Sequence, residues 1–188
     1  MQNRDNATLA ESAAVLFVDH QVGTAERGQT ADPITVDKNA ARLAKAAQIF
    51  DMPIVVSVVG LRGKPELTPE LRAALGDGVA LHERLGTDSL DDPTIAGILK
   101  ETGRSTLLIA GIVTEIAAQR PALSAARHGF WAQVVLDACN GRTERSEHAA
   151  LLRMNAAGVQ LTSIPAILGE LARDFGDPRT AQLFGLMA

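Results

Sequence analysis

Several features that would quickly place a protein in a functional class are scarce in this 188-residue sequence. It has one cysteine, Cys139, so it can form neither an internal disulfide nor a zinc site built from cysteines. A single thiol is typical of a reducing compartment, and we expect a cytoplasmic protein. The longest apolar runs are short and the N-terminus is polar, so we expect neither a membrane span nor a signal peptide.

Strong charge is missing as well. The formal net charge is -4, and no basic stretch indicates a nucleic-acid partner. No Gly-x-Gly-x-x-Gly pattern follows the first predicted strand, and the histidines lack metal-ligand spacing. We therefore expect no dinucleotide, no metal and no other cofactor.

Apolar residues, in contrast, are plentiful at 46%, which is enough for the core of one domain over residues 1–188. Six short apolar runs alternate with segments of helical period, and several runs lack the polar/apolar alternation of half-exposed strands. The runs lie at 13–18, 54–59, 79–81, 106–110, 133–136 and 159–161; the helical segments lie at 36–50, 93–102, 114–128, 143–157 and 165–175. This order predicts an α/β fold, with a doubly wound, mostly parallel six-stranded sheet and helices on both faces.

In such sheets, ligands bind at the carboxyl ends of the strands. Asp19 follows the first strand and could be a general acid or base, or only a helix cap or salt-bridged strand end. Arg84 follows the third strand and could hold a substrate carboxylate, stabilise Asp19 as an anion, or lie on the surface. The stretch 111–117 joins a strand to a helix, whose first N–H groups could bind an anion or a developing oxyanion. An ordinary turn would look the same.

Other positions near these strand ends read as structural. His20 adjoins Asp19, but neighbours on a strand point to opposite faces, so we interpret His20 as a packing residue. Cys139 is interpreted as a small buried residue. Residues 21–33 are polar and contain glycine, which predicts a long surface loop in a common place for a lid.

Together, three segments of the chain resemble one known family. Residues 14–21 read AVLFVDHQ, residues 111–115 read GIVTE, and residues 121–125 read PALSA, with further support at 134–138 and 152–161. These segments resemble the isochorismatase-like (cysteine hydrolase) superfamily, in its YcaC-like branch, and the match covers roughly 13–171. Each segment alone would be weak, but the set is specific.

The resemblance implies a fold, a chemistry and a set of site residues. The family's catalytic triad contains an aspartate, a lysine or arginine, and a cysteine; Asp19 and Arg84 match the first two. The family pattern Gly-x-x-Thr-Glu-x-Cys places Ala117 where the nucleophilic cysteine should be, and alanine has no nucleophilic atom. Members also tend to form homo-oligomers, which we expect here.

Two backbone features are implied by the same resemblance. A cis peptide bond between non-proline residues is expected at Val113–Thr114. Val113 and Thr114 are expected to bind substrate or its oxyanion, and the amides near Thr114 and Ala117 to form the oxyanion hole. Gln21 is expected to line the substrate pocket.

Three interpretations follow. The first is a hydrolase scaffold for a small amide or related compound, inactive by the covalent route because of Ala117. The second is a cysteine-independent hydrolase that cleaves a vinyl ether by proton chemistry at Asp19. The third is a non-catalytic protein that binds a small ligand. The sequence does not separate a natural alanine at this position from an engineered one.

Overall fold

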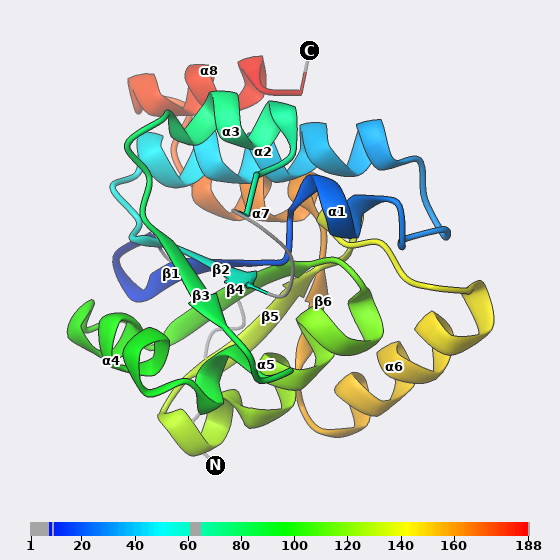
Figure 1. The fold of residues 1–188 in the computed structure, drawn as a ribbon. Helices are drawn as coiled ribbons and strands as arrows, with labels where there is room; N and C mark the ends of the chain where they lie inside the picture. Colours follow the sequence, from blue (N-terminus) through cyan, green and yellow to red (C-terminus); the bar gives the residue numbers. More distant parts are fainter. Residues whose placement is uncertain (1–7, 9, 61–64, 188) are drawn as a thin grey trace.

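The computed structural model describes residue 8 and residues 10–60 and 65–187. Its six strands form one parallel sheet in the order β3-β2-β1-β4-β5-β6, which confirms the predicted fold class (Figure 1). The strands are β1 (Ala13–Val18), β2 (Ile54–Val59), β3 (Leu81–Arg84), β4 (Thr106–Gly111), β5 (Trp131–Val135) and β6 (Gln160–Thr162). The chain runs from β1 outward to one edge and then returns to β4 beside β1, so the strand order reverses between these two central strands.

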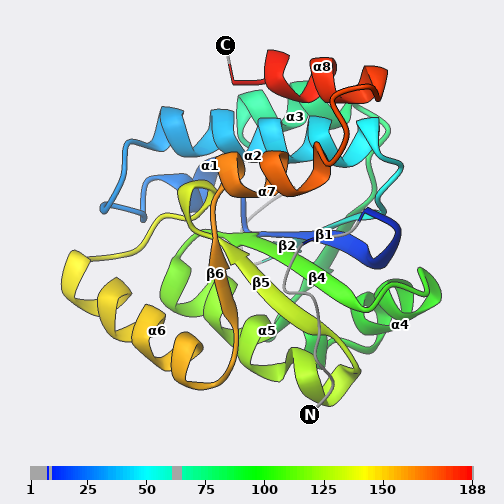
Figure 2. The same ribbon diagram turned by 180° about the vertical axis from the view of Figure 1, so that it is seen from behind.

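Helices cover both faces of the sheet. Figures 1 and 2 show α2, α3, α7 and α8 on one face, and α4, α5 and α6 on the other. The helices are α1 (Val22–Ala25), α2 (Pro33–Ile49), α3 (Pro69–Leu75), α4 (Pro93–Glu101), α5 (Gln119–Ser124), α6 (Glu144–Ala156), α7 (Ile164–Leu171) and α8 (Pro178–Gly185). No helix among the described residues is long and apolar enough to cross a membrane.

The first strand explains why the sheet needs helices on both sides. All six of its residues are buried, and they divide by alternation between two hydrophobic clusters. Val15 and Phe17 pack into the cluster beneath α2 and α7, whereas Leu16 and Val18 pack into the cluster beneath α4 and α5. A strand buried on both faces has no polar positions, which is the pattern that the sequence shows.

Predicted helix ends agree best where capping residues are present. Asp92 accepts hydrogen bonds from the amides of Thr94 and Ile95, and Pro93 occupies the first helical position of α4. At the other end of that helix, Gly103 has a φ of 68°, a conformation that favours glycine.

Other boundaries in the sequence-based prediction were wrong. The third strand is Leu81–Arg84 rather than 79–81, and α7 ends at Leu171 rather than 175. Both α3 and α8 were missed, although each begins with a proline at its first position. Their short length left too few apolar repeats to reveal a helical period.

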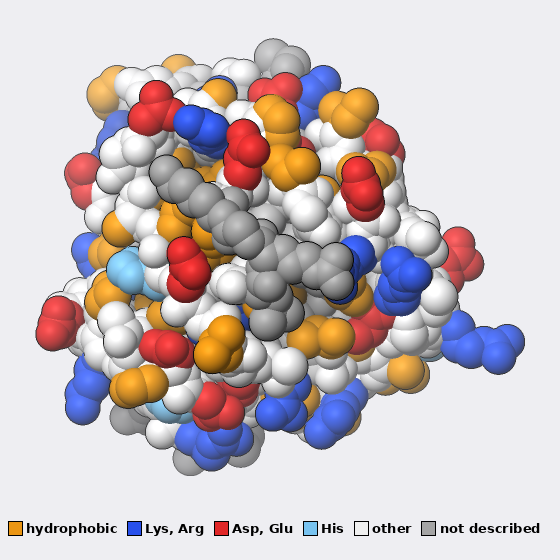
Figure 3. Space-filling model, viewed as in Figure 1, with side chains coloured by type: hydrophobic (Ala, Val, Ile, Leu, Met, Phe, Trp, Pro, Cys, Tyr) orange, Lys and Arg blue, Asp and Glu red, His pale blue; other side chains and the backbone are white. Residues whose placement is uncertain are grey.

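On the face drawn in Figure 3, acidic and basic side chains are interspersed rather than gathered by sign. The visible described residues of this face therefore form no broad surface of one charge.

Candidate active site

A buried ion pair lies at the carboxyl edge of the sheet. The Arg84 guanidinium donates from Nη1 to Asp19 Oδ1 at 2.7 Å and from Nη2 to Asp19 Oδ2 at 2.8 Å. Both residues are buried, Asp19 with 7% and Arg84 with 3% of its surface exposed. This two-point contact with a planar guanidinium gives both carboxylate oxygens a charge-assisted hydrogen bond and fixes the orientation of the carboxylate. The sequence placed both residues at strand ends; the structure shows that they meet.

The backbone around Asp19 explains how its side chain reaches this position. Asp19 has a φ of 58°, in the left-handed region, so the chain turns sharply as β1 ends. Its amide donates to the carbonyl of Ser57 on β2 at 2.9 Å, and its carbonyl accepts from the amide of Gln21 at 2.8 Å. The turn thus fixes Asp19 between β1 and β2.

Position 117 lies next to the end of β4. Gly111 is paired with Val18, the residue before Asp19, and a Cβ on Gly111 would lie 2.9 Å from the carbonyl carbon of Ala117 and 3.0 Å from its Cβ. Ala117 itself is buried, in the π-helical turn Thr114–Ala118. Glycine at 111 is therefore needed for the close approach of the turn, which brings position 117 to the strand ends that carry Asp19.

The cis peptide bond lies one residue earlier than expected. It joins Ile112 to Val113, not Val113 to Thr114. The prediction was wrong in position because it rested on a motif alignment, which counts residues and carries no information on backbone dihedral angles.

Of the three amides at the expected oxyanion site, two already donate within the chain. The Thr114 amide donates to the carbonyl of Asn140 at 3.1 Å, and the Ala117 amide donates to the carbonyl of Val113 at 2.7 Å. The Val113 amide donates to no other described residue. Among these three amides, Val113 therefore has the N–H left for a ligand.

The Gln21 side chain is bound to the backbone of Val59. Its side-chain amide donates to the carbonyl of Val59 at 3.2 Å, and its side-chain oxygen accepts from the amide of Val59 at 2.9 Å. The side chain therefore extends the end of β2 as another strand would. That Gln21 contacts substrate stays a prediction. The observed contacts join the Gln21 side chain to the backbone at the end of β2.

His20 and Cys139 are both fully enclosed. Burial lowers the pKa of His20 to about 4, although the nearby negative charge of Asp37 acts in the opposite direction. Burial raises the pKa of the Cys139 thiol to about 12, and its Sγ accepts a hydrogen bond from the amide of Gly111. The structure thus places Cys139 beneath the site as a neutral thiol, and His20 as a neutral packing residue.

The described residues contain no group of three or more His, Cys, Asp or Glu side chains that could hold a metal ion. The sequence of residues 57–64, at and after the end of β2, contains no histidine or aspartate, and residues 61–64 lie outside the described residues.

One residue that sequence reasoning missed is Asn140. It lies in the loop that follows β5, after Cys139, and its side chain and backbone connect two parts of the site. Because β5 ends at Val135, Asn140 does not directly follow a strand as Asp19 does, and the sequence signal for it was weaker.

Comparison of the sequence with known proteins identifies one family. The isochorismatase domain model matches residues 13–166. The chain is 34% identical over 164 residues to the probable hydrolase YcaC of Escherichia coli (strain K12), which covers 87% of this chain and 79% of that protein. It is 28% identical over 144 residues to isochorismatase domain-containing protein 2 of Rattus norvegicus, covering 77% and 67%.

Solved structures give the same result. The Escherichia coli YcaC gene product, described as an octameric hydrolase of unknown specificity, matches with a TM-score of 0.89 and 33% identity, covering 98% of this chain and 92% of that one. YcaC from Pseudomonas aeruginosa, solved with hexane-2,5-diol and covalent acrylamide, matches with a TM-score of 0.88 and 30% identity, covering 97% and 92%.

Proposed function

The chain belongs to the isochorismatase family, and from this premise we propose that it has the scaffold of a hydrolase for the C–N bond of a small amide or related compound. Ala117 stands where the family's nucleophilic cysteine is expected, so the covalent route is absent in this sequence. The observation that carries the proposal is the buried Asp19–Arg84 ion pair beside the turn that bears Ala117.

The proposed chemistry becomes complete when a thiol is supplied at position 117. Asp19, oriented by Arg84, accepts the thiol proton, and the sulfur forms a bond to the substrate carbonyl carbon. The carbonyl oxygen takes up the negative charge facing the Val113 amide. The C–N bond then breaks, the amine leaves with the proton, and water hydrolyses the thioester. Without the sulfur, we expect little amidase activity.

Vinyl-ether cleavage driven by Asp19 is the second candidate. Proton donation to the vinyl carbon would require a protonated Asp19, yet both carboxylate oxygens accept hydrogen bonds from Arg84. A proton would have to displace one of these charge-assisted bonds, which are among the stronger interactions in proteins. The amidase route also passes a proton through Asp19, so the ion pair favours neither candidate over the other, and neither over a non-catalytic protein that binds a small ligand.

The deciding experiment compares the chain with its Ala117→Cys variant on a panel of small amides and on isochorismate. We expect amide turnover only in the variant, and loss of that turnover when Asp19→Asn is added. Cys139→Ala in the same background is the matched control, because Cys139 is buried and should not contribute. Cleavage of isochorismate by the unaltered chain, abolished by Asp19→Asn, would put the second candidate first. Saturable ligand binding without turnover in either form would favour the binding protein.

We also propose that the chain forms a homo-oligomer, since the structurally similar Escherichia coli YcaC is described as octameric. Light scattering at micromolar concentration tests this, and the mass of a monomer would contradict it. The cytoplasmic location and the extent of one domain over residues 1–188 stay predictions.

A further inference from the structure

The segment after α1, expected to be a surface loop suited to a lid, is tightly fastened to the loop that follows β5. The Gln29 amide donates to the carbonyl of Gly141 at 2.7 Å, and the Gly141 amide donates to Thr30 Oγ1 at 2.8 Å. The Arg142 side chain donates to the carbonyl of Arg27 at 3.0 Å. We call residues 27–31 the strap. These hydrogen bonds join the strap to the loop after β5 at several points along its length.

Asn140 is the centre of this attachment. Its Oδ1 accepts from the amides of Thr30 and Ala31, each at 3.0 Å, and from Thr30 Oγ1 at 3.2 Å. Its Nδ2 donates to the carbonyl of Ala31 at 3.0 Å. The strap also packs directly on it, since a Cβ on Gly28 would lie 2.4 Å from Asn140 Cγ. The side chain is completely buried, so its polar groups have exchanged water for the strap.

The backbone of the same residue holds the other side of the site. The Asn140 carbonyl accepts from the Thr114 amide at 3.1 Å, and Asn140 pairs with Ile112 in a short parallel bridge. Ile112 and Thr114 flank Val113, whose amide is left for a ligand.

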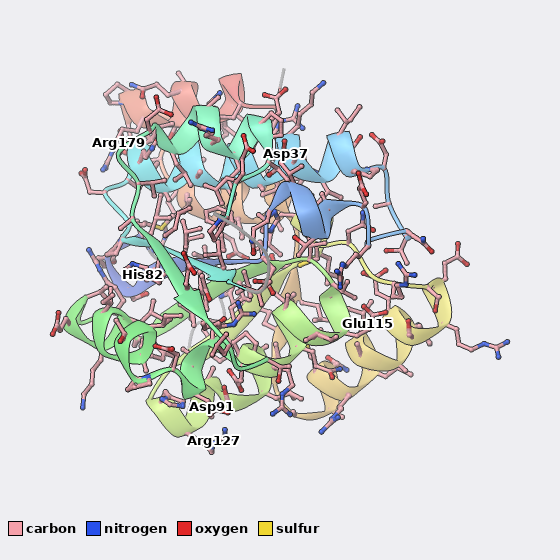
Figure 4. All side chains as sticks on the ribbon, in the orientation of Figure 1. Asp37, His82, Asp91, Glu115, Arg127 and Arg179 are labelled. Carbon is pink, nitrogen blue, oxygen red and sulfur yellow. The ribbon has the colours of Figure 1, made fainter. Side chains whose placement is uncertain are left out.

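Carboxylates reinforce this connection. Thr114 Oγ1 donates to Glu147 on α6 at 2.7 Å, and Glu115 accepts from the Arg142 amide at 3.0 Å. Figure 4 shows Glu115 between the α5 and α6 ribbons. The loop that contains Asn140 thus meets the turn after β4 through side chains as well as backbone.

We propose that Asn140 is a positioning residue of the site, which couples the strap after β1 to the turn that carries the Val113 amide and position 117. The inference rests on the proposed function, because it assumes that this turn presents the reacting groups. Its physical basis is that the buried Asn140 side chain makes the hydrogen bonds to the strap, while the Asn140 carbonyl binds the Thr114 amide in the turn after β4. Loss of the side chain frees the strap and leaves the Asn140 backbone less constrained.

The strap is tested first, without reference to activity. Trypsin cleaves after arginine, and Arg27 lies within the strap, where its carbonyl is bound by Arg142. In Asn140→Ala, we expect cleavage after Arg27 to become about tenfold faster, the factor given by the loss of one to two net hydrogen bonds in a local opening. The matched control is Asn39→Ala, which truncates another buried asparagine whose amide donates to the Asp137 carbonyl instead. Equal cleavage in both variants would overturn the proposal.

Coupling to the site is tested in the Ala117→Cys background through the pH dependence of alkylation by iodoacetamide. The chain with alanine at 117, measured in parallel, is the blank that accounts for any reaction of Cys139. We expect Asn140→Ala to slow alkylation at pH 7 about tenfold and to move the midpoint of the profile upward, towards that of a free thiol. Thr30→Val, which removes only the hydroxyl contacts of the strap, should give a smaller change in the same direction and covers the case in which Asn140→Ala does not fold.

The outcomes separate the two proposals. If the introduced thiol has the profile of a free thiol even with Asn140 intact, the proposed function fails. If that thiol is activated but neither Asn140→Ala nor Thr30→Val changes its profile, the strap is not coupled to the site and the positioning role is refuted.

Discussion

His20 makes the stability of this fold sensitive to acid. Its ring is completely buried and lies edge-on to the Phe17 ring, with 5.6 Å between the ring centroids. Neither ring nitrogen makes a hydrogen bond to a described residue. Burial lowers its pKa from 6.5 to about 4, since the imidazolium ion cannot be solvated there. The unfolded chain, with the ordinary pKa, therefore binds a proton at a pH where the folded chain does not.

The sign and size of the effect follow from this difference. The contribution of neutral His20 is fully present above pH 6.5 and is lost as the pH falls from 6.5 towards 4. At about 1.4 kcal/mol for each pH unit, the complete loss is roughly 3 kcal/mol, and about 2 kcal/mol of it is lost between pH 7 and pH 4.5.

Urea unfolding of His20→Leu and of the unaltered chain, each at pH 7 and pH 4.5, measures this contribution. Between pH 7 and pH 4.5, we expect the free energy of unfolding to fall by about 2 kcal/mol less in His20→Leu than in the unaltered chain. The variant lacks the buried titrating group, while its carboxylates titrate as before. His148→Leu removes an exposed histidine and should keep the full pH dependence. If His20→Leu kept it too, the assignment of the acid sensitivity to His20 would be wrong.

Three further predictions concern the ion pair, the thiol and a helix start. Arg84→Met leaves a buried carboxylate without its partner and should lower the free energy of unfolding by about 3–5 kcal/mol in urea, whereas Arg72→Met, which breaks only exposed ion pairs, should cost less than about 1 kcal/mol. Cys139, whose pKa is raised to about 12 by burial, should not react with a thiol reagent at pH 8 until urea unfolds the chain; rapid labelling in the folded state would contradict its enclosure. Asp137→Ala removes the carboxylate that accepts from the Ile164 amide at the start of α7 and should cost about 1–2 kcal/mol in thermal or urea unfolding, with an unchanged stability as the contrary result.

The parts of the fold that could be predicted are those that require particular types of side chain at particular positions. Strands buried on both faces appear as apolar runs, and Asp92 with Pro93 marks the start of α4. The same kind of information located Asp19 and Arg84, because polar residues directly after buried strands lie at the edge where parallel sheets bind ligands.

The features of the fold and site that were not predicted depend on backbone hydrogen bonds, which side-chain patterns in the sequence do not reveal. Which amide keeps a free N–H is decided by the carbonyls nearby, and the Thr114 amide meets the Asn140 carbonyl only after two distant segments fold together. The Gln21 side chain, expected from the resemblance to line the pocket, pairs with the amide and the carbonyl of Val59, a contact that the sequence did not reveal. Such long-range polar pairings have no period in the sequence.

The packing of position 117 bears on how the alanine should be understood. Gly111 has no Cβ, and an added one would lie 2.9 Å from the Ala117 backbone, so this glycine serves the approach of the turn and not the identity of the side chain at 117. Arg84 likewise keeps both of its contacts with Asp19, a buried charge pair whose desolvation is costly and which a protein without use for the site could replace by apolar residues. The proposed function therefore predicts that Ala117→Cys alone, with Gly111, Asp19 and Arg84 unchanged, is enough to open the covalent route.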